Sequence, residues 1–351
     1  MFVYKTYKTK RFFPVAAVTL AVLNIAALLL TRLVPRFADF FSDNVYPFWV
    51  KTVGFVVGFL PFSLWEALIA AFILAVIIFI IFHIVKKRFP KGKTWYRLLT
   101  ALLAVLLVFN IFCGVNYYRE PFSAQIGLTT DKYTKEQLLS VIDILTVGLE
   151  DSEPTATDNN DLPTLAVLAM SNLSDKYAVL RTNYPKPKPI LTARYTMSPF
   201  LVCGIYSALT AEANYNNDMP QSDKPFTICH ELSHLSGFMQ EEEANFIAFL
   251  ACAESDDPRF RRSGYIRAVV YALNAYSTVA TAEEYDLAAA KLPASVQEEI
   301  AEVNDYWKPF RNTKPAKVSS AVNDTYLKVN GQSEGERSYG RMVDLLIAYY
   351  I

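Results

Sequence analysis

Three long apolar runs in the first third of the chain limit its fold more than any other feature of the sequence. Residues 12–30, 67–85 and 98–115 contain no Asp, Glu, Lys or Arg. A helix of about 20 apolar residues spans the hydrocarbon core of a bilayer. The sequence therefore predicts a membrane anchor over residues 1–118. Its three transmembrane helices are expected at about 12–30, 64–85 and 98–116.

Basic residues predict how these helices are oriented. The N-terminal tail and the loop between the second and third runs carry Lys and Arg without acids, whereas the first loop carries both signs. Since loops rich in Lys and Arg remain in the cytoplasm, we expect a multi-pass protein of the cell membrane with a cytoplasmic N-terminus and an extracytoplasmic C-terminal part. The basic residues are Lys5, Lys8, Lys10 and Arg11 in the tail, and Lys86, Lys87, Arg88, Lys91, Lys93 and Arg97 in the loop.

The stretch 45–60 leaves an alternative open. It is apolar but interrupted by Lys51 and by glycines, which is typical of a segment at the membrane interface or dipping into it. If it crossed the bilayer instead, the C-terminal part would lie in the cytoplasm.

The net charge of zero conceals two parts of opposite sign. Residues 1–118 carry 13 Lys and Arg against 3 Asp and Glu, a net charge of +10, whereas residues 119–351 carry 21 against 31, a net charge of −10. An acidic C-terminal part argues against nucleic acid as a partner. The lipid bilayer and a peptide or protein substrate are the partners that we expect. The four cysteines show no CxxC spacing, so they give no support for a cysteine zinc knuckle.

Residues 119–351 are predicted to form one extracytoplasmic domain, mostly helical, of α+β type with a short sheet. Thr134 and Gln137 have the spacing of a capping box ahead of an apolar helical pattern. The prolines of residues 185–189 stop any helix, and residues 190–215 have the composition of short strands and turns. The fold class of the whole chain is thus mainly α.

An HExxH motif is the main functional signal of this domain. It is formed by His230, Glu231 and His234. Residues four apart share one face of a helix, so the two imidazoles can hold one Zn²⁺ while the glutamate between them acts as a base on water. Two of the three histidines of the chain lie in this motif, which makes a chance match rare.

A catalytic zinc site takes a third protein ligand, and the remaining histidine, His83, is expected at the far end of the second transmembrane helix. The third ligand is therefore expected to be a carboxylate. On an unbroken helix, Glu241 would lie about 10 Å along the axis from His234, too far to share a metal. The chain must turn between them, and Gly237 can supply the turn.

Helical phase distinguishes the candidate carboxylates. At about 100° per residue, Glu241 and Glu243 point to nearly opposite faces, so both cannot reach one ion. We favour Glu241, because Asn245 shares its face and can hydrogen-bond a ligand histidine. Glu243 remains the alternative.

These motifs resemble the zincin metallopeptidases, and in particular the gluzincin branch. There, HExxH on one helix is joined by a glutamate on a second helix, often as ExxxD or ExxxN, which Glu241 and Asn245 match. The metzincin pattern HExxHxxGxxH fits at Gly237 but has Gln240 where its third histidine should be. The two motifs also lie closer together here than in many gluzincins.

A second resemblance covers nearly the whole chain. The segments 204–206, 210–214, 225–234, 243–246 and 326–328 are similar to a family of bacterial membrane proteins of unknown function, with N-terminal membrane helices and a metallopeptidase-like C-terminal domain. This resemblance implies a bacterial membrane protein and supplies no substrate.

Together these features predict a membrane-anchored zinc metalloendopeptidase, with Glu231 as catalytic base and His230, His234 and Glu241 as zinc ligands. A non-enzymatic sensor or scaffold with a structural metal site is the alternative. Charged residues flank the motif, which favours cleavage outside the bilayer. The candidates for a transition-state donor are Tyr195, Tyr206, Arg194 and Tyr265.

Overall fold

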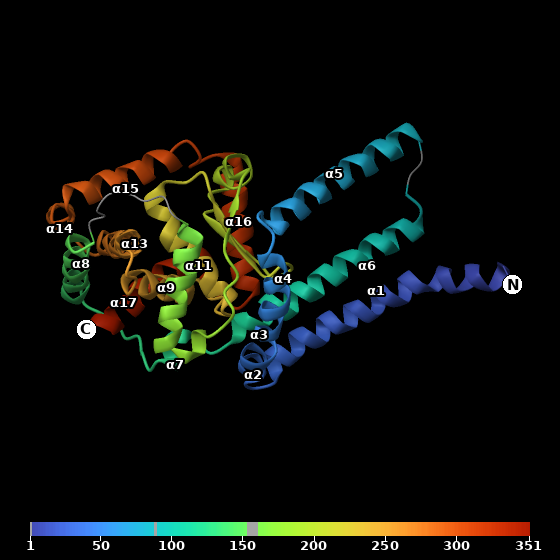
Figure 1. The fold of residues 1–351 in the computed structure, drawn as a ribbon, viewed down its shortest axis with the longest axis horizontal. Coiled ribbons are helices and arrows are strands. Elements are labelled where there is room, and N and C mark those ends of the chain that lie inside the picture. Colours follow the sequence, from blue (N-terminus) through green and yellow to red (C-terminus); the bar gives the residue numbers. More distant parts are fainter. Residues whose placement is uncertain (1, 88–89, 153–160) are drawn as a thin grey trace.

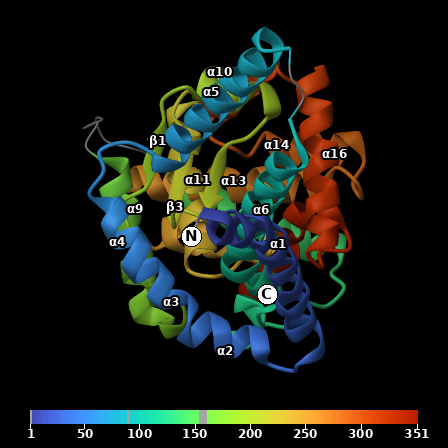
Figure 2. The same cartoon turned by 90° about the vertical axis from the view of Figure 1, so that its right-hand side faces the viewer.

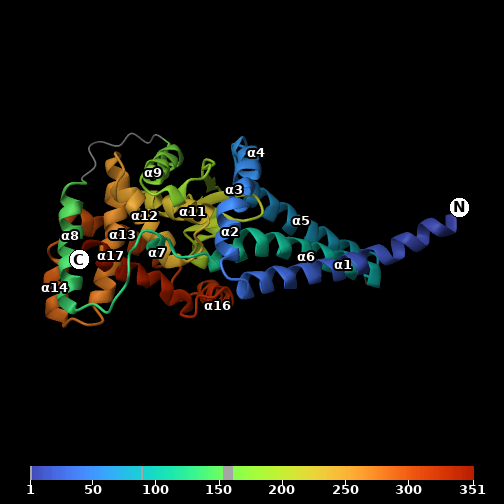
Figure 3. The same ribbon diagram turned by 90° about the horizontal axis from the view of Figure 1, so that it is seen from below.

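Three long helices extend from one side of a helical body (Figures 1 and 3). The computed structural model describes residues 2–87, 90–152 and 161–351, with side chains from Phe12 onward. The long helices are α1 (Phe2–Leu33), α5 (Leu64–Val85) and α6 (Gly92–Phe109), and α6 continues through a π-helical and a 3-10 turn to Tyr118. The basic side chains of the N-terminal tail and of Arg88, on which the predicted orientation partly rests, lie outside the described residues.

The three predicted transmembrane helices are confirmed as candidate membrane spans. The segments Phe12–Leu33, Leu64–Val85 and Gly92–Tyr118 are long and apolar enough to cross a membrane by length and composition. The third begins earlier than the predicted residue 98, because the helix includes the polar turn that starts at Gly92. No residue of α5 is buried inside the protein, as expected of a helix whose surface contacts lipid.

The first loop does not form a fourth span. It folds into α2 (Phe37–Asn44), α3 (Tyr46–Trp49), a π-helical turn (Val50–Gly54) and α4 (Phe55–Gly58). These pieces are shorter than the roughly 20 residues that a crossing needs. They curve around one side of the three long helices at the level where those helices enter the body (Figure 2).

The body is mainly α with a small sheet, as predicted. Its principal helices are α8 (Lys135–Glu150), α9 (Leu162–Lys176), α11 (Lys224–Leu235), α12 (Glu241–Ala253), α13 (Pro258–Tyr276), α14 (Ala282–Ala289), α15 (Ala294–Trp307), α16 (Lys314–Val329) and α17 (Met342–Tyr350), with short α7 (Phe122–Gln125) and α10 (Ala193–Thr196). Helix α8 begins with the predicted capping box, in which Thr134 and Gln137 satisfy each other's backbone N–H groups.

The sheet has three strands in the order β1 (Lys188–Ile190), β3 (Glu212–Asn216), β2 (Gly204–Ser207). Strand β1 runs parallel to β3, and β2 runs antiparallel to it, with Gly204 opposite Tyr215. The side of β2 away from β3 is an edge of the sheet, and its residues Gly204, Ile205 and Tyr206 are only half-buried.

Helix α11, which carries HExxH, lies at the centre of the body. It packs against α12, α13, α9 and both β2 and β3. Every residue of α11 except His230 is buried. The polar side chains of Glu231 and His234 in the HExxH motif are thus enclosed together with the apolar ones.

Two glutamates tie α5 to the sheet. The carboxylate of Glu212, on β3, accepts hydrogen bonds of 2.9 Å from the backbone N–H groups of both Leu64 and Trp65 at the start of α5. In return, Glu66 in the first turn of α5 accepts from the backbone of Leu191 and Thr192. A helix N-terminus favours negative charge and leaves N–H groups unpaired, so Glu212 stabilises α5 on both counts.

Candidate metal centre

The turn after α11 brings α12 back over the HExxH face, as predicted. Gly237 has φ +96°, a conformation that residues with a Cβ rarely adopt. The backbone N–H of Phe238 donates to the carbonyl of Ser233, which closes the turn. A Cβ at Gly237 would also stand 3.1 Å from Arg119 Nη1 and 3.4 Å from the ring of Tyr46. Glycine is therefore required here by both conformation and space.

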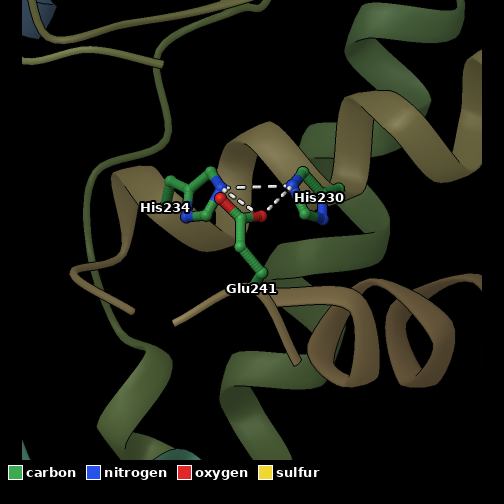
Figure 4. Close-up of side chains that lie close together, drawn as sticks. All are labelled: His230, His234 and Glu241. Atoms are coloured by element: carbon green, nitrogen blue, oxygen red, sulfur yellow. Dashed lines mark hydrogen bonds and ion pairs between the residues drawn. The ribbon is translucent and has the colours of Figure 1, made fainter. Parts of the chain in front are cut away.

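The three predicted ligands meet at one point (Figure 4). His230 Nε2 and His234 Nε2 are 3.1 Å apart, and Glu241 Oε2 is 3.3 Å from the first and 3.6 Å from the second. The three form a group of side chains that can hold a metal ion, with ligand atoms within 4.8 Å of one another. All three side chains are at most 13% exposed.

The residues fit a zinc ion. Within the described residues, Glu241 Oε2 is buried and accepts no hydrogen bond, although it faces two imidazole nitrogens. His234 Nδ1 lies 2.9 Å from the carbonyl of Phe238, which fixes an N–H at Nδ1, so that in the neutral imidazole the lone pair is at Nε2. Two imidazoles and one carboxylate are a ligand set that zinc takes in catalytic sites.

The predicted interaction between Asn245 and a ligand histidine is present at His230, although its geometry is not that of a full hydrogen bond. Asn245 lies near His230 and acts to raise its pKa. Its side-chain N–H groups, however, are directed at 3.5 Å to Tyr271 Oη and at 3.4 Å to the carbonyl of Tyr339. Among the described residues, His230 Nδ1 has no hydrogen-bond partner.

Charge is distributed unevenly over the three side chains. Burial lowers the pKa of His230. Burial acts in the same direction on His234, but the carboxylate of Glu241 outweighs it and raises the pKa of His234 to about 9. Burial opposes the charge of Glu241, yet the histidines hold its pKa at about 2. The site therefore presents a carboxylate with full negative charge beside the imidazole pair.

Glu243, the alternative ligand, lies elsewhere. Its carboxylate accepts hydrogen bonds from the backbone N–H and the hydroxyl of Ser123, at 2.8 and 2.6 Å. Gln240, which stands at the third histidine position of the metzincin pattern, donates to the carbonyls of Tyr117 and Arg119. Both side chains connect α12 to the segment that follows α6 and do not join the histidines.

Glu231 lies under the edge strand β2. A Cβ on Gly204 would stand 2.3 Å from Glu231 Oε1, so the strand approaches the carboxylate as closely as a glycine allows. Burial raises the pKa of Glu231 to about 8, while the backbone of Tyr206 and the charge of His234 act to lower it. A carboxyl group with a pKa near neutrality is suited to both accepting and donating a proton.

One of the four predicted transition-state donors, Tyr206, lies on the edge strand over Glu231, whereas the other three make their contacts elsewhere. Tyr195 is 79% exposed. Arg194 pairs with Asp218 on the surface. Tyr206 shares a hydrogen bond with Tyr46, and the ring of Tyr265 packs against Phe249.

Two residues of α13 that the sequence did not single out lie near the site. The hydroxyl of Tyr271 contacts the amide of Asn245. Burial raises the pKa of Tyr271, and the negative charge of Glu241 acts in the same direction. Arg267, one helical turn earlier, forms a 2.6 Å ion pair with Asp223 ahead of α11. Both are half-buried, as is His230. Their i, i+4 spacing was the only sequence signal, and without α13 packed on α12 it points to no site.

Comparison with known families assigns the chain to a group defined by sequence. The family described as "protein of unknown function (DUF3810)" matches residues 41–347. The chain belongs to this family. The matched region begins in α2, ends in α17, and includes the HExxH helix, Glu241 and the edge strand. No curated protein and no solved structure matches the chain. Membership of the DUF3810 family thus carries no activity, and the chemistry has to be argued from the site.

Proposed function

We propose that this chain is a membrane-anchored zinc metalloendopeptidase of gluzincin type. One observation carries the proposal: two imidazole nitrogens and a buried carboxylate converge on one point beside a second buried carboxylate, Glu231, that is not part of the group. A site built only to bind metal has no need of this additional acid. The resemblance of HExxH and Glu241 to the gluzincin motifs supports the same activity.

In this proposal His230, His234 and Glu241 hold the zinc ion. A zinc ion in such a site supplies a Lewis acid for the scissile carbonyl and makes a water molecule more acidic. The carboxylate of Glu231 would accept a proton from the attacking water and would later return it to the leaving amine. Burial raises the pKa of Glu231, and the positive charge of a bound metal would favour the carboxylate form that accepts the proton.

Strand β2 is the element that we propose to bind the peptide. An extended peptide can add to the open edge of a sheet through backbone hydrogen bonds. Glu231 lies directly against this strand at Gly204, so a peptide on its edge would run near the base. Tyr271 is the proposed donor to the oxygen that gains charge in the transition state, because it is half-buried and adjacent to Asn245.

The proposed location is the outer face of the cell membrane. The end of α1, the start of α5 and the end of α6 all adjoin the body that contains the site (Figure 1). The site is therefore on a single side of the bilayer if all three helices span it. The basic tail and second loop favour the extracytoplasmic side.

A second candidate function is a sensor or scaffold with a structural metal site. The low exposure of the ligand side chains, 13% or less, favours it, because structural zinc sites are closed whereas catalytic sites keep one position open. Glu231 and the half-buried His230 favour the enzyme.

The deciding experiment uses the full chain in nanodiscs. Bound zinc is measured by mass spectrometry, and cleavage is measured on a quenched fluorescent peptide library with wild type and Glu231→Gln. We expect about one zinc per chain in both proteins, and a cleavage rate about 10²–10⁴-fold lower in the variant. Protein without zinc rejects the metal centre. Zinc-loaded protein with no cleavage, or with equal cleavage in both forms, rejects the enzyme and favours the sensor.

A further inference from the structure

The segment between α1 and α5 has two faces of different character. We call residues 37–62 the belt. The inner face of the belt is buried against the body and consists of Ala38, Ser42, Tyr46, Val50, Gly54 and Val57. The outer face carries exposed apolar side chains, with Phe40, Phe48, Phe55, Val56 and Phe59 between 57% and 73% exposed, and the exposed polar residues Asn44 and Lys51 lie among them. Exposed phenylalanines at this density are unusual on a surface in water, and they mark a contact with an apolar partner.

Chain connectivity places the belt at a membrane surface. It joins the end of one candidate span, at Leu33, to the start of the next, at Leu64. Those two ends lie on the same side of the bilayer whichever way the protein is oriented, so the belt lies at that surface too. The ribbon agrees, because α2, α3 and α4 run across the base of the long helices and not along them (Figures 1 and 2).

The same level is apolar on the other side of the spans. Helix α16 crosses the base there and exposes Val318, Val322 and Val329. A mainly apolar groove of about 540 Å³ separates its Val322 and Val329 from the ends of α1 and α6. Apolar surface therefore flanks the spans on both sides at the depth of the belt.

The inner face of the belt connects this level to the metal centre. Tyr46 Oη donates to the carbonyl of Leu235, the last residue of the HExxH helix, at 3.1 Å. The same hydroxyl is 2.8 Å from that of Tyr206 on the edge strand. Trp49 donates to the carbonyl of Ala208 just beyond that strand. The belt thus contacts both the helix that carries the histidines and the strand that lies over Glu231.

We infer that the belt lies in the surface of the bilayer, with the phenylalanine face of residues 40–59 among the lipid acyl chains, and that it holds the metal centre close to the membrane surface. Amphipathic helical segments bind in this way when an apolar face enters the boundary between headgroups and acyl chains. The partner is the lipid bilayer itself. This inference does not depend on the proposed peptidase activity, since it concerns only the belt and the spans.

Site-directed spin labelling of the full chain tests the inference. Phe48→Cys and Phe59→Cys are labelled with a nitroxide in nanodiscs of phosphatidylcholine and phosphatidylglycerol. Leu287→Cys is the matched control, because Leu287 is 70% exposed on α14, away from the spans (Figure 1). Wild-type protein measures the labelling of the native cysteines, of which Cys203 alone is not buried.

At positions 48 and 59 we expect collisions with oxygen, which concentrates among acyl chains, to exceed collisions with a water-soluble nickel chelate. At position 287, collisions with the nickel chelate should exceed collisions with oxygen. Nickel access at 48 and 59 equal to that at 287 overturns the inference. Exclusion of both reagents, together with spin–spin broadening, also overturns it, because a second copy of the chain would then cover the face. A thermal unfolding temperature equal to that of wild type shows that the labelled variants are folded.

Discussion

Gly204 on the edge strand and Glu231 on the HExxH helix are in such close contact that a Cβ at position 204 would lie 2.3 Å from Glu231 Oε1. Gly204→Ala should therefore displace the Glu231 carboxylate while leaving the three metal ligands in place. A misplacement of about 1 Å can reduce a catalysed rate about 10²-fold, so we expect cleavage to fall by that order with zinc retained. Gly340→Ala is the control, because nothing lies within 4 Å of its added methyl. Unchanged cleavage in Gly204→Ala would remove Glu231 from the mechanism.

Glu241 and Glu243 should respond differently to removal of the carboxylate. Glu241→Ala deletes a proposed ligand and should abolish zinc retention after dialysis. Glu243→Ala should retain zinc, but it leaves the buried N–H and hydroxyl of Ser123 without their partner and should cost about 1–3 kcal/mol of stability. Zinc content and thermal unfolding of both variants give the comparison. Loss of zinc from the Glu243 variant alone would reassign the third ligand.

Tyr271→Phe should separate turnover from metal binding. It removes a hydroxyl next to Asn245 and no ligand, so zinc content should stay at the wild-type level. Loss of a transition-state donor typically reduces kcat about 10²–10³-fold. Tyr195→Phe is the matched control, since Tyr195 was a candidate on sequence grounds and is 79% exposed. Equal kcat in the two variants would exclude Tyr271 as the donor.

Gly237→Ala should destabilise the protein. The methyl forces a residue with a Cβ into φ +96° and presses on Arg119 and Tyr46. A strained backbone of this kind costs on the order of 1–3 kcal/mol. Thermal unfolding of the variant and of wild type in nanodiscs measures the loss. Zinc affinity should fall with stability, because the turn sets the distance between Glu241 and the histidines. A variant as stable as wild type would show that the turn can adopt a second conformation.

Glu212→Ala should loosen the junction between the sheet and α5. The substitution leaves two N–H groups at the start of α5 without the carboxylate that accepts them. Hydrogen bonds to a charged group contribute about 1.5–3 kcal/mol each, part of which water can replace. We expect a lower unfolding temperature and faster hydrogen exchange at Leu64 and Trp65. Exchange rates like those of wild type would mean that Ser63, which accepts from Glu66, caps the helix alone.

The metal centre was predictable because its information is local. His230 and His234 are fixed by helical spacing, and the separation of seven residues from His234 to Glu241 is enough to argue that a turn is needed and that Gly237 makes it. The apolar spans were predictable for a similar reason, since length and hydropathy are properties of one segment.

The supports of the site were not predictable, because they join residues that are distant in sequence. Tyr46 and Leu235 are 189 residues apart, and Leu64 and Glu212 are 148 apart. No periodicity relates such pairs, and only the packed fold brings them together. The same holds for Tyr271, whose relation to Asn245 depends on how α13 lies against α12. The hydrogen-bond partners of the Glu66 side chain were not predictable either. The spacing of Ser63 and Glu66 indicates a capping box, but the carboxylate of Glu66 accepts from the backbone of Leu191 and Thr192.

Hydrogen bonds in both directions connect α5 to the sheet, so a movement of this helix would be transmitted to the sheet. The carboxylate of Glu212 accepts hydrogen bonds from the first turn of α5, and the carboxylate of Glu66 in α5 accepts hydrogen bonds from the chain just after β1. Transmembrane helices change their tilt when the thickness of the bilayer changes. A tilt of α5 would be passed through these four backbone contacts to β3, and from β3 to the edge strand above Glu231. We therefore expect the geometry of the site to depend on the thickness of the membrane around it.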